Sequence, residues 1–127
     1  MKLLTALCYV EVFFLTLFLL ANSISVNHMI GNSMYPISHN DDYALFQTAW
    51  FDKENIANGT VIAFRVHCTA CNDSDMIVCH RIVEVAQDRH GRFYITKGDH
   101  NNNIDVAFDV RPDNITGIFL FILWRSE

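Results

Sequence analysis

The feature that most constrains this chain is an apolar run of nineteen residues, 3–21, in which Glu11 is the one charged side chain. A helix rises about 1.5 Å per residue, so a run of this length nearly spans a bilayer core of about 30 Å. We therefore predict a membrane anchor at residues 1–22, although Glu11 weakens insertion by about 2–3 kcal/mol. The alternative is a cleaved signal peptide, whose apolar core is usually shorter, about 7–15 residues.

The distribution of basic residues predicts the orientation of this anchor. Lys2 precedes the apolar run, and no Lys or Arg follows it until well into the downstream part. Because cations are retained on the cytoplasmic side, we expect a single-pass protein with a cytoplasmic N-terminus and residues 23–127 on the lumenal or extracytoplasmic side. Three Asn-x-Ser/Thr triplets, at Asn58, Asn72 and Asn114, fit that side in a host that glycosylates proteins.

The downstream part is long enough for one modest domain and leaves no room for a second. The chain has 127 residues, a formal net charge of −5 and nine Lys and Arg residues that are scattered rather than clustered. Nucleic-acid binding normally needs clustered cations that displace counterions from phosphates. We therefore exclude nucleic acid as a partner.

Short β-branched and aromatic runs separated by turns predict a mainly β domain with mostly antiparallel strands. The polar residues 87–91 separate two such runs and predict a hairpin. Residues 22–32 are rich in Asn and Ser, so we expect a connector there, and residues 50–56 are expected to form a single turn. The expected strands are 43–46, 60–66, 76–85, 92–96 and 115–124.

The strand expected at 76–85 determines where its side chains point. Successive residues of a strand face opposite sides of a sheet. His80, Ile82 and Glu84 should therefore lie on one face and their neighbours on the other. This placement would give the His80 ring a well-defined direction.

Ser33, His80 and two later carboxylates supply the groups that acyl transfer needs. A serine hydroxyl is a poor nucleophile near neutral pH unless a base takes its proton and donors hold the oxyanion. A histidine can act as that base, and a carboxylate can fix its tautomer. Asp99 and Asp105, which follow the strand expected at 92–96, are the candidates for the carboxylate.

Five groups of residues extend this pattern along the chain. They are GNSMYP at 31–36, NGTVIAF at 58–64, IVCHRIV at 77–83, TKGDHN at 96–101, and Asp105. In this order they resemble the type I signal peptidases, in the endoplasmic-reticulum and archaeal branch that uses Ser and His in place of Ser and Lys. The resemblance extends from the anchor to about residue 117. It implies a compact signal-peptidase-like β barrel or sandwich at residues 23–127.

The resemblance also implies roles for individual residues. Ser33 would be the nucleophile and His80 the general base and then acid, supported by Asp105 or Asp99. Asp105 ranks first, because its six-residue offset from the Gly-Asp pair matches the family's acidic residue. The remaining implied residues are Met34 and Pro36 for substrate binding, and the Ser33 N–H with the Asn32 side chain for the oxyanion.

The activity implied is that of a serine endopeptidase that removes signal peptides from translocated preproteins at the membrane surface. Its partners would be the signal peptides of preproteins and membrane lipid, with other subunits of a signal peptidase complex as further candidates. No metal or other cofactor is expected.

Two positions depart from the family's pattern. Gly31 occupies the place, two residues before the nucleophile, where family members commonly carry a Ser that helps to hold the oxyanion. Asp41-Asp42 replaces a Gly-Asp pair, which we expect to alter a turn without affecting the chemistry. A catalytically silent relative that binds peptide segments is therefore one alternative. A Lys-based variant is another, but Lys97 belongs to a loop and not to the strand where that base would lie.

A cluster of cysteine and histidine residues leaves a further alternative open. His67, Cys68 and Cys71 precede Cys79 and His80, and together they offer enough ligands for a tetrahedral zinc site. On an oxidising side, a disulfide among the three cysteines is an equally simple arrangement. A zinc ion bound to His80 would prevent that residue from acting as a base, so the zinc module and the peptidase exclude each other.

Overall fold

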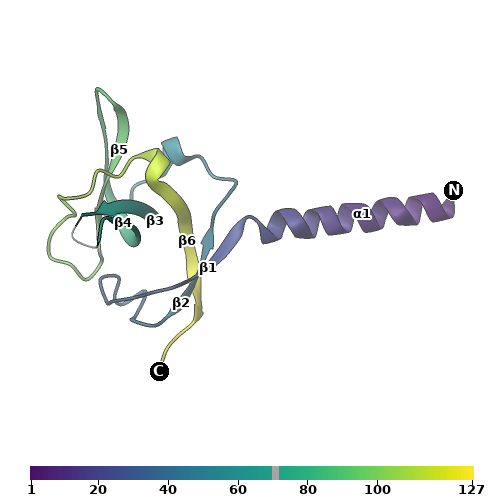
Figure 1. Ribbon diagram of the computed structural model, residues 1–127, viewed down its shortest axis with the longest axis horizontal. Helices are drawn as coiled ribbons and strands as arrows, with labels where there is room; N and C mark the ends of the chain where they lie inside the picture. The colour runs from purple at the N-terminus through teal and green to yellow at the C-terminus, as the bar shows by residue number, and fades with distance from the viewer. Residues whose placement is uncertain (70–71) are drawn as a thin grey trace.

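A computed structural model describes residues 1–69 and 72–127 of the chain. It begins with helix α1 (Lys2–Ala21), which projects away from the rest of the molecule (Figure 1) and has no buried residue. A helix that is apolar on all sides and packs against no other element is typical of a membrane span. Among the described residues, α1 is the one helix long and apolar enough to cross a bilayer.

The described residues after α1 form one six-stranded antiparallel sheet, with the strand order β1-β2-β6-β3-β4-β5. The expectation of a mainly antiparallel β domain is confirmed, and all five predicted strands are present within three residues of their predicted ends. The short turn expected at 50–56 is a 3₁₀ helix, η1 (Lys53–Asn55), and a second one, η2 (Pro112–Asn114), precedes β6. The predicted strands correspond to β2 (Tyr43–Gln47), β3 (Val61–Cys68), β4 (Ser74–Asp88), β5 (Gly91–Lys97) and β6 (Ile115–Trp124).

One strand was not predicted. Residues 22–32 were expected to be a connector, but they contain β1 (Ile24–His28), which pairs with β2 along its whole length. Its sequence, ISVNH, alternates apolar and polar side chains, yet it is short and most of it remains exposed. Pairing with a distant strand therefore decides its conformation, because the local pattern is too weak to do so.

The predicted alternation along β4 holds only for its first half. His80 and Ile82 are both buried, but the pairing with β5 shifts register between Ile82 and Glu84. This irregularity places Val85, rather than Glu84, against the core cluster that contains Ile82. The expectation that Glu84 shares a face with His80 is wrong, because one extra residue in a strand reverses the phase of the side chains that follow.

The first half of β3, residues 61–64, is buried on both of its faces and separates two apolar clusters. Ile62 and Phe64 belong to the larger cluster, while Ala63 belongs to a smaller one that also contains Met29 and Phe46. A strand covered on both faces has little freedom to move. It gives β4, its neighbour in the sheet, a rigid support.

Candidate active site

The side chain of Ser33 lies in the loop that joins β1 to β2. Its Oγ is 3.1 Å from Nε2 of His80, which is buried in the middle of β4. The two residues are 47 positions apart in the sequence, and the folding of the sheet brings them within hydrogen-bond distance. This is the separation that a nucleophile and its general base require.

The other nitrogen of the His80 ring contacts Asp105. Its Nδ1 is 2.6 Å from Oδ2 of Asp105, and both side chains are about nine-tenths buried. The same carboxylate oxygen accepts a hydrogen bond of 2.8 Å from the Thr96 hydroxyl. An ionised carboxylate only accepts hydrogen bonds, so Asp105 holds the proton on Nδ1 and leaves Nε2 free to accept from the Ser33 hydroxyl.

Asp99 lies on the other side of β4. Its two carboxylate oxygens accept hydrogen bonds of 2.8 and 2.6 Å from the Arg81 guanidinium, and Arg81 also donates to the Gly59 carbonyl. Of the two carboxylates considered for the support of His80, the structure thus brings Asp105 to the imidazole. Asp99 connects the loop after β5 to β4.

The turn at residues 97–101 fixes the backbone of Ser33. The His100 N–H donates a hydrogen bond of 2.8 Å to the Ser33 carbonyl. A side chain at Gly98 would place its Cβ 2.7 Å from that same carbonyl, so only glycine allows the two backbone segments to approach so closely. The Lys97 ammonium donates to the Asn101 carbonyl at 2.6 Å, which closes this turn. Lys97 is the last residue of β5 rather than the loop residue that was expected, and its ammonium is bound to the turn that follows that strand.

A cavity of about 450 Å³ opens beside the Ser33 and His80 side chains. Met34, which is 2 % exposed, contributes to its wall, as the sequence suggested for a substrate-binding residue. Pro36 is exposed and lies outside the lining. Two short segments, 27–31 and 76–80, also line this cavity.

The groups suggested for the oxyanion differ in their placement. The Ser33 N–H makes no hydrogen bond within the described part of the chain, so it is free to donate to a ligand. The Asn32 side chain accepts from the Asn40 N–H at 2.9 Å and lines a different hollow, so the structure does not bring it to the cavity. Ser38, which no sequence motif indicated, is a buried hydroxyl in the cavity wall.

Backbone conformation accounts for the residue types at positions 31 and 41. Gly31 has a φ of +89°, in the left-handed region that favours glycine, so a serine there would be strained. Asp41 has a φ of +67°, which Asp tolerates better than most residues. Its carboxylate is 2.9 Å from Nε2 of His28 and accepts a hydrogen bond from the Asn40 side chain. Asp41 therefore adopts a backbone conformation that favours glycine, and its side-chain contacts hold it in that conformation.

Of the cysteine and histidine residues considered for zinc, those that the structure describes do not form a group that could bind a metal ion. Cys68 takes part in a disulfide bond, Cys79 carries a free thiol, and Cys71 lies outside the described residues. The two ring nitrogens of His67 contact Asp73 and Asp75. The two ring nitrogens of His80 contact Ser33 and Asp105. Within residues 1–69 and 72–127, no three His, Cys, Asp or Glu side chains are grouped so that they could hold a metal ion.

Comparison of the chain with protein-family models, with curated proteins and with solved structures finds no match.

Proposed function

We propose that this chain is a membrane-anchored serine endopeptidase with a signal-peptidase-like fold, and that it cleaves signal peptides from preproteins at the membrane surface. The observation that carries the proposal is that His80 contacts Ser33 through one ring nitrogen and Asp105 through the other. Ser33 Oγ lies 3.1 Å from His80, and His80 lies 2.6 Å from Asp105. Each distance is short enough for a proton to be held or transferred along it.

The chemistry follows from these contacts. His80 Nε2 takes the proton of Ser33 as its Oγ attacks the scissile carbonyl, and Asp105 stabilises the imidazolium that forms. The Ser33 N–H donates to the developing oxyanion. His80 then gives the proton to the leaving amine, and the acyl-enzyme formed on Ser33 is hydrolysed by water, which His80 activates in turn.

The strand arrangement supports a peptide as the substrate. β1 lies at the end of the sheet, and residues 74–80 of β4 pair with β3 alone among the described strands. Both segments line the cavity beside Ser33. An extended peptide can form main-chain hydrogen bonds with such free edges, while its side chains enter the apolar cavity. The helix α1 would keep this cleft near substrates that are themselves anchored in the bilayer.

The test is cleavage of a model preprotein by the full-length chain in detergent micelles. The Ser33→Ala and His80→Ala variants should each lower kcat by about 10,000-fold or more, because each removes a group that moves the proton. His90→Ala is the matched control, since His90 is an exposed histidine in the turn between β4 and β5. It should cleave at the wild-type rate.

Two results would overturn the assignment. Activity that persists in His80→Ala would show that another base acts on Ser33. Tight binding of the signal peptide with no cleavage by the wild-type protein would identify a silent peptide-binding relative instead.

A further inference from the structure

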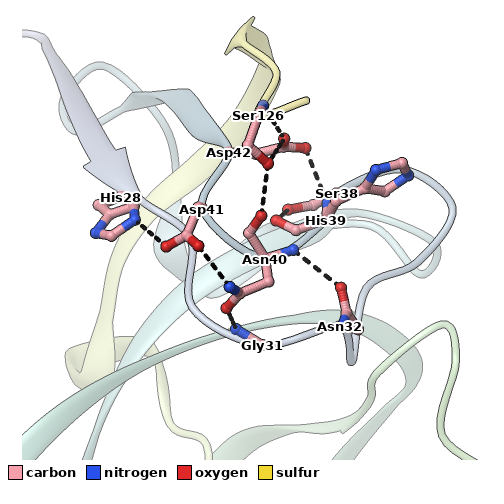
Figure 2. Close-up of polar contacts among 9 residues, drawn as sticks. All are labelled: His28, Gly31, Asn32, Ser38, His39, Asn40, Asp41, Asp42 and Ser126. Atoms are coloured by element: carbon pink, nitrogen blue, oxygen red, sulfur yellow. Dashed lines mark hydrogen bonds and ion pairs between the residues drawn. The ribbon is translucent and has the colours of Figure 1, made fainter.

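Polar contacts shape the loop that carries Ser33, and Asn40 takes part in four of them (Figure 2). Its Oδ1 accepts a hydrogen bond of 2.7 Å from the Gly31 N–H, and its own N–H donates to Oδ1 of Asn32 at 2.9 Å. Its Nδ2 donates to the Asp41 carboxylate at 2.7 Å. The first two contacts tie Asn40 to the two residues that immediately precede the nucleophile.

These two contacts act on a part of the backbone that has few constraints of its own. Gly31 has a positive φ and is exposed, and a glycine has more accessible conformations than any other residue. On the other side of the nucleophile, the Ser33 carbonyl is already held by the His100 N–H. The paired contacts between Asn40 and the 31–32 segment therefore supply the constraint on the side where the chain enters Ser33.

The segment that follows β6 also contacts Asn40. The Ser126 hydroxyl donates to the Asn40 carbonyl at 2.7 Å, and the Ser126 N–H donates to Oδ1 of Asp42 at 3.0 Å. Asp42 is fully buried and also accepts from the His39 N–H at 2.8 Å. Figure 2 shows the resulting network, which continues from Ser126 through Asn40 to Gly31.

The charge of Asp42 stabilises this arrangement. Burial raises the pKa of its carboxyl group, but the N–H donors of His39 and Ser126 and the Arg125 guanidinium outweigh that effect, so the net pKa is lowered. The carboxylate therefore stays ionised at neutral pH and keeps both N–H groups paired.

We propose that Asn40 is a positioning residue that, held by Ser126, fixes the backbone before Ser33 and so directs the Ser33 hydroxyl toward His80. This inference rests on the proposed function. Asn40 touches neither substrate nor the reacting atoms in this role. It acts through the orientation of the nucleophile, and a small misplacement of reacting groups costs about 100-fold in rate.

The test uses full-length protein in detergent micelles and a fluorophosphonate probe, which labels an activated serine without the need for a peptide substrate. Asn40→Ala should lower the labelling rate of Ser33 and the kcat for a model preprotein about tenfold or more, with KM changed less than twofold. Asn40→Asp keeps an acceptor for the Gly31 N–H but loses the donor to Asp41 and places a second carboxylate beside it, so it should recover only part of the rate. Ser126→Ala, which leaves Asn40 in place, should have a smaller effect.

Asn55→Ala is the matched control for a loss of stability alone. Asn55 is another exposed asparagine, and its side chain bonds to Asp52 and Arg92 at η1, outside the lining of the cavity. This variant should lower Tm as much as Asn40→Ala while the labelling of Ser33 is unchanged. A labelling rate in Asn40→Ala within twofold of wild type would overturn the positioning role. Failure of the proposed function would differ, because wild-type Ser33 would then not be labelled at all.

Discussion

Asp99 and Asp105 lie six residues apart on one loop and reach neighbouring residues of β4 from its two sides. Asp105 contacts His80, and both side chains are nearly buried. Asp99 contacts Arg81, whose side chain is about one-third exposed. The Arg81 pKa is raised, chiefly by its hydrogen bonds to Asp99. The two residues on β4 point in opposite directions because they are consecutive in a strand.

The comparison shows that the chemical role of each carboxylate depends on the face of β4 that it reaches. On the His80 face, the carboxylate meets an imidazole that contacts a hydroxyl beside a cavity. On the Arg81 face, the carboxylate meets a permanently charged group that cannot transfer a proton. We therefore expect Asp105 to govern the reaction and Asp99 to govern stability.

The largest expected effect belongs to Asp105→Asn. An amide at this position can donate to Nδ1 and so favour the tautomer in which Nε2 carries the proton, which prevents Nε2 from accepting it from Ser33. We expect kcat to fall about 1,000- to 10,000-fold with little change in Tm. Preprotein cleavage and thermal unfolding of the same sample measure the two effects. A variant that retains a tenth of the activity would contradict the role of Asp105.

Asp99→Asn should affect mainly stability. It removes a charge from a partly buried ion pair with two hydrogen bonds, and a charged hydrogen bond contributes about 1.5–3 kcal/mol. For a domain of this size, we expect Tm to fall by roughly 10 °C, with kcat within tenfold of wild type at a temperature where the variant is folded. If kcat instead fell as far as in Asp105→Asn, the division between the two carboxylates would be wrong.

Thr96→Val should have a smaller effect that separates the two carboxylates further. The Thr96 hydroxyl donates to the same Asp105 oxygen that contacts His80, and valine has nearly the same shape without that donor. Loss of one hydrogen bond of about 1 kcal/mol predicts a decrease of about fivefold in kcat. The measurement is steady-state cleavage of the preprotein. The same change in an Asp105→Asn background should add nothing, and an additive loss would show that Thr96 acts independently.

The smallest effect concerns Cys79, the residue that precedes His80 on β4. Burial raises the pKa of its thiol to about 12. At pH 8 only about one thiol in 10,000 would be ionised, so we expect very slow alkylation by iodoacetamide, rising about tenfold for each pH unit. Peptide mapping by mass spectrometry measures the modification, with urea-unfolded protein as the control. Rapid alkylation of folded protein at pH 8 would show that this part of β4 is open to water.

The sequence by itself determined the elements with strong local patterns. The apolar run at residues 3–21 specifies a helix by its length and composition, and the β-branched and aromatic runs between turns specify five strands. The motif order also identified Ser33, His80 and Asp105 as residues to examine together. Their spacing along the chain carried no information about distance.

Only the tertiary structure decided which of these residues meet. β1 forms because β2 is there to pair with it, and the bulge after Ile82 changes the phase of β4 in a way that no alternation rule predicts. The choice between Asp99 and Asp105, and the contacts of Asn40 with Gly31 and Ser126, depend on loops that close over long stretches of chain. Local propensity cannot encode such contacts, because their free energy appears only when the distant segments have already been brought together.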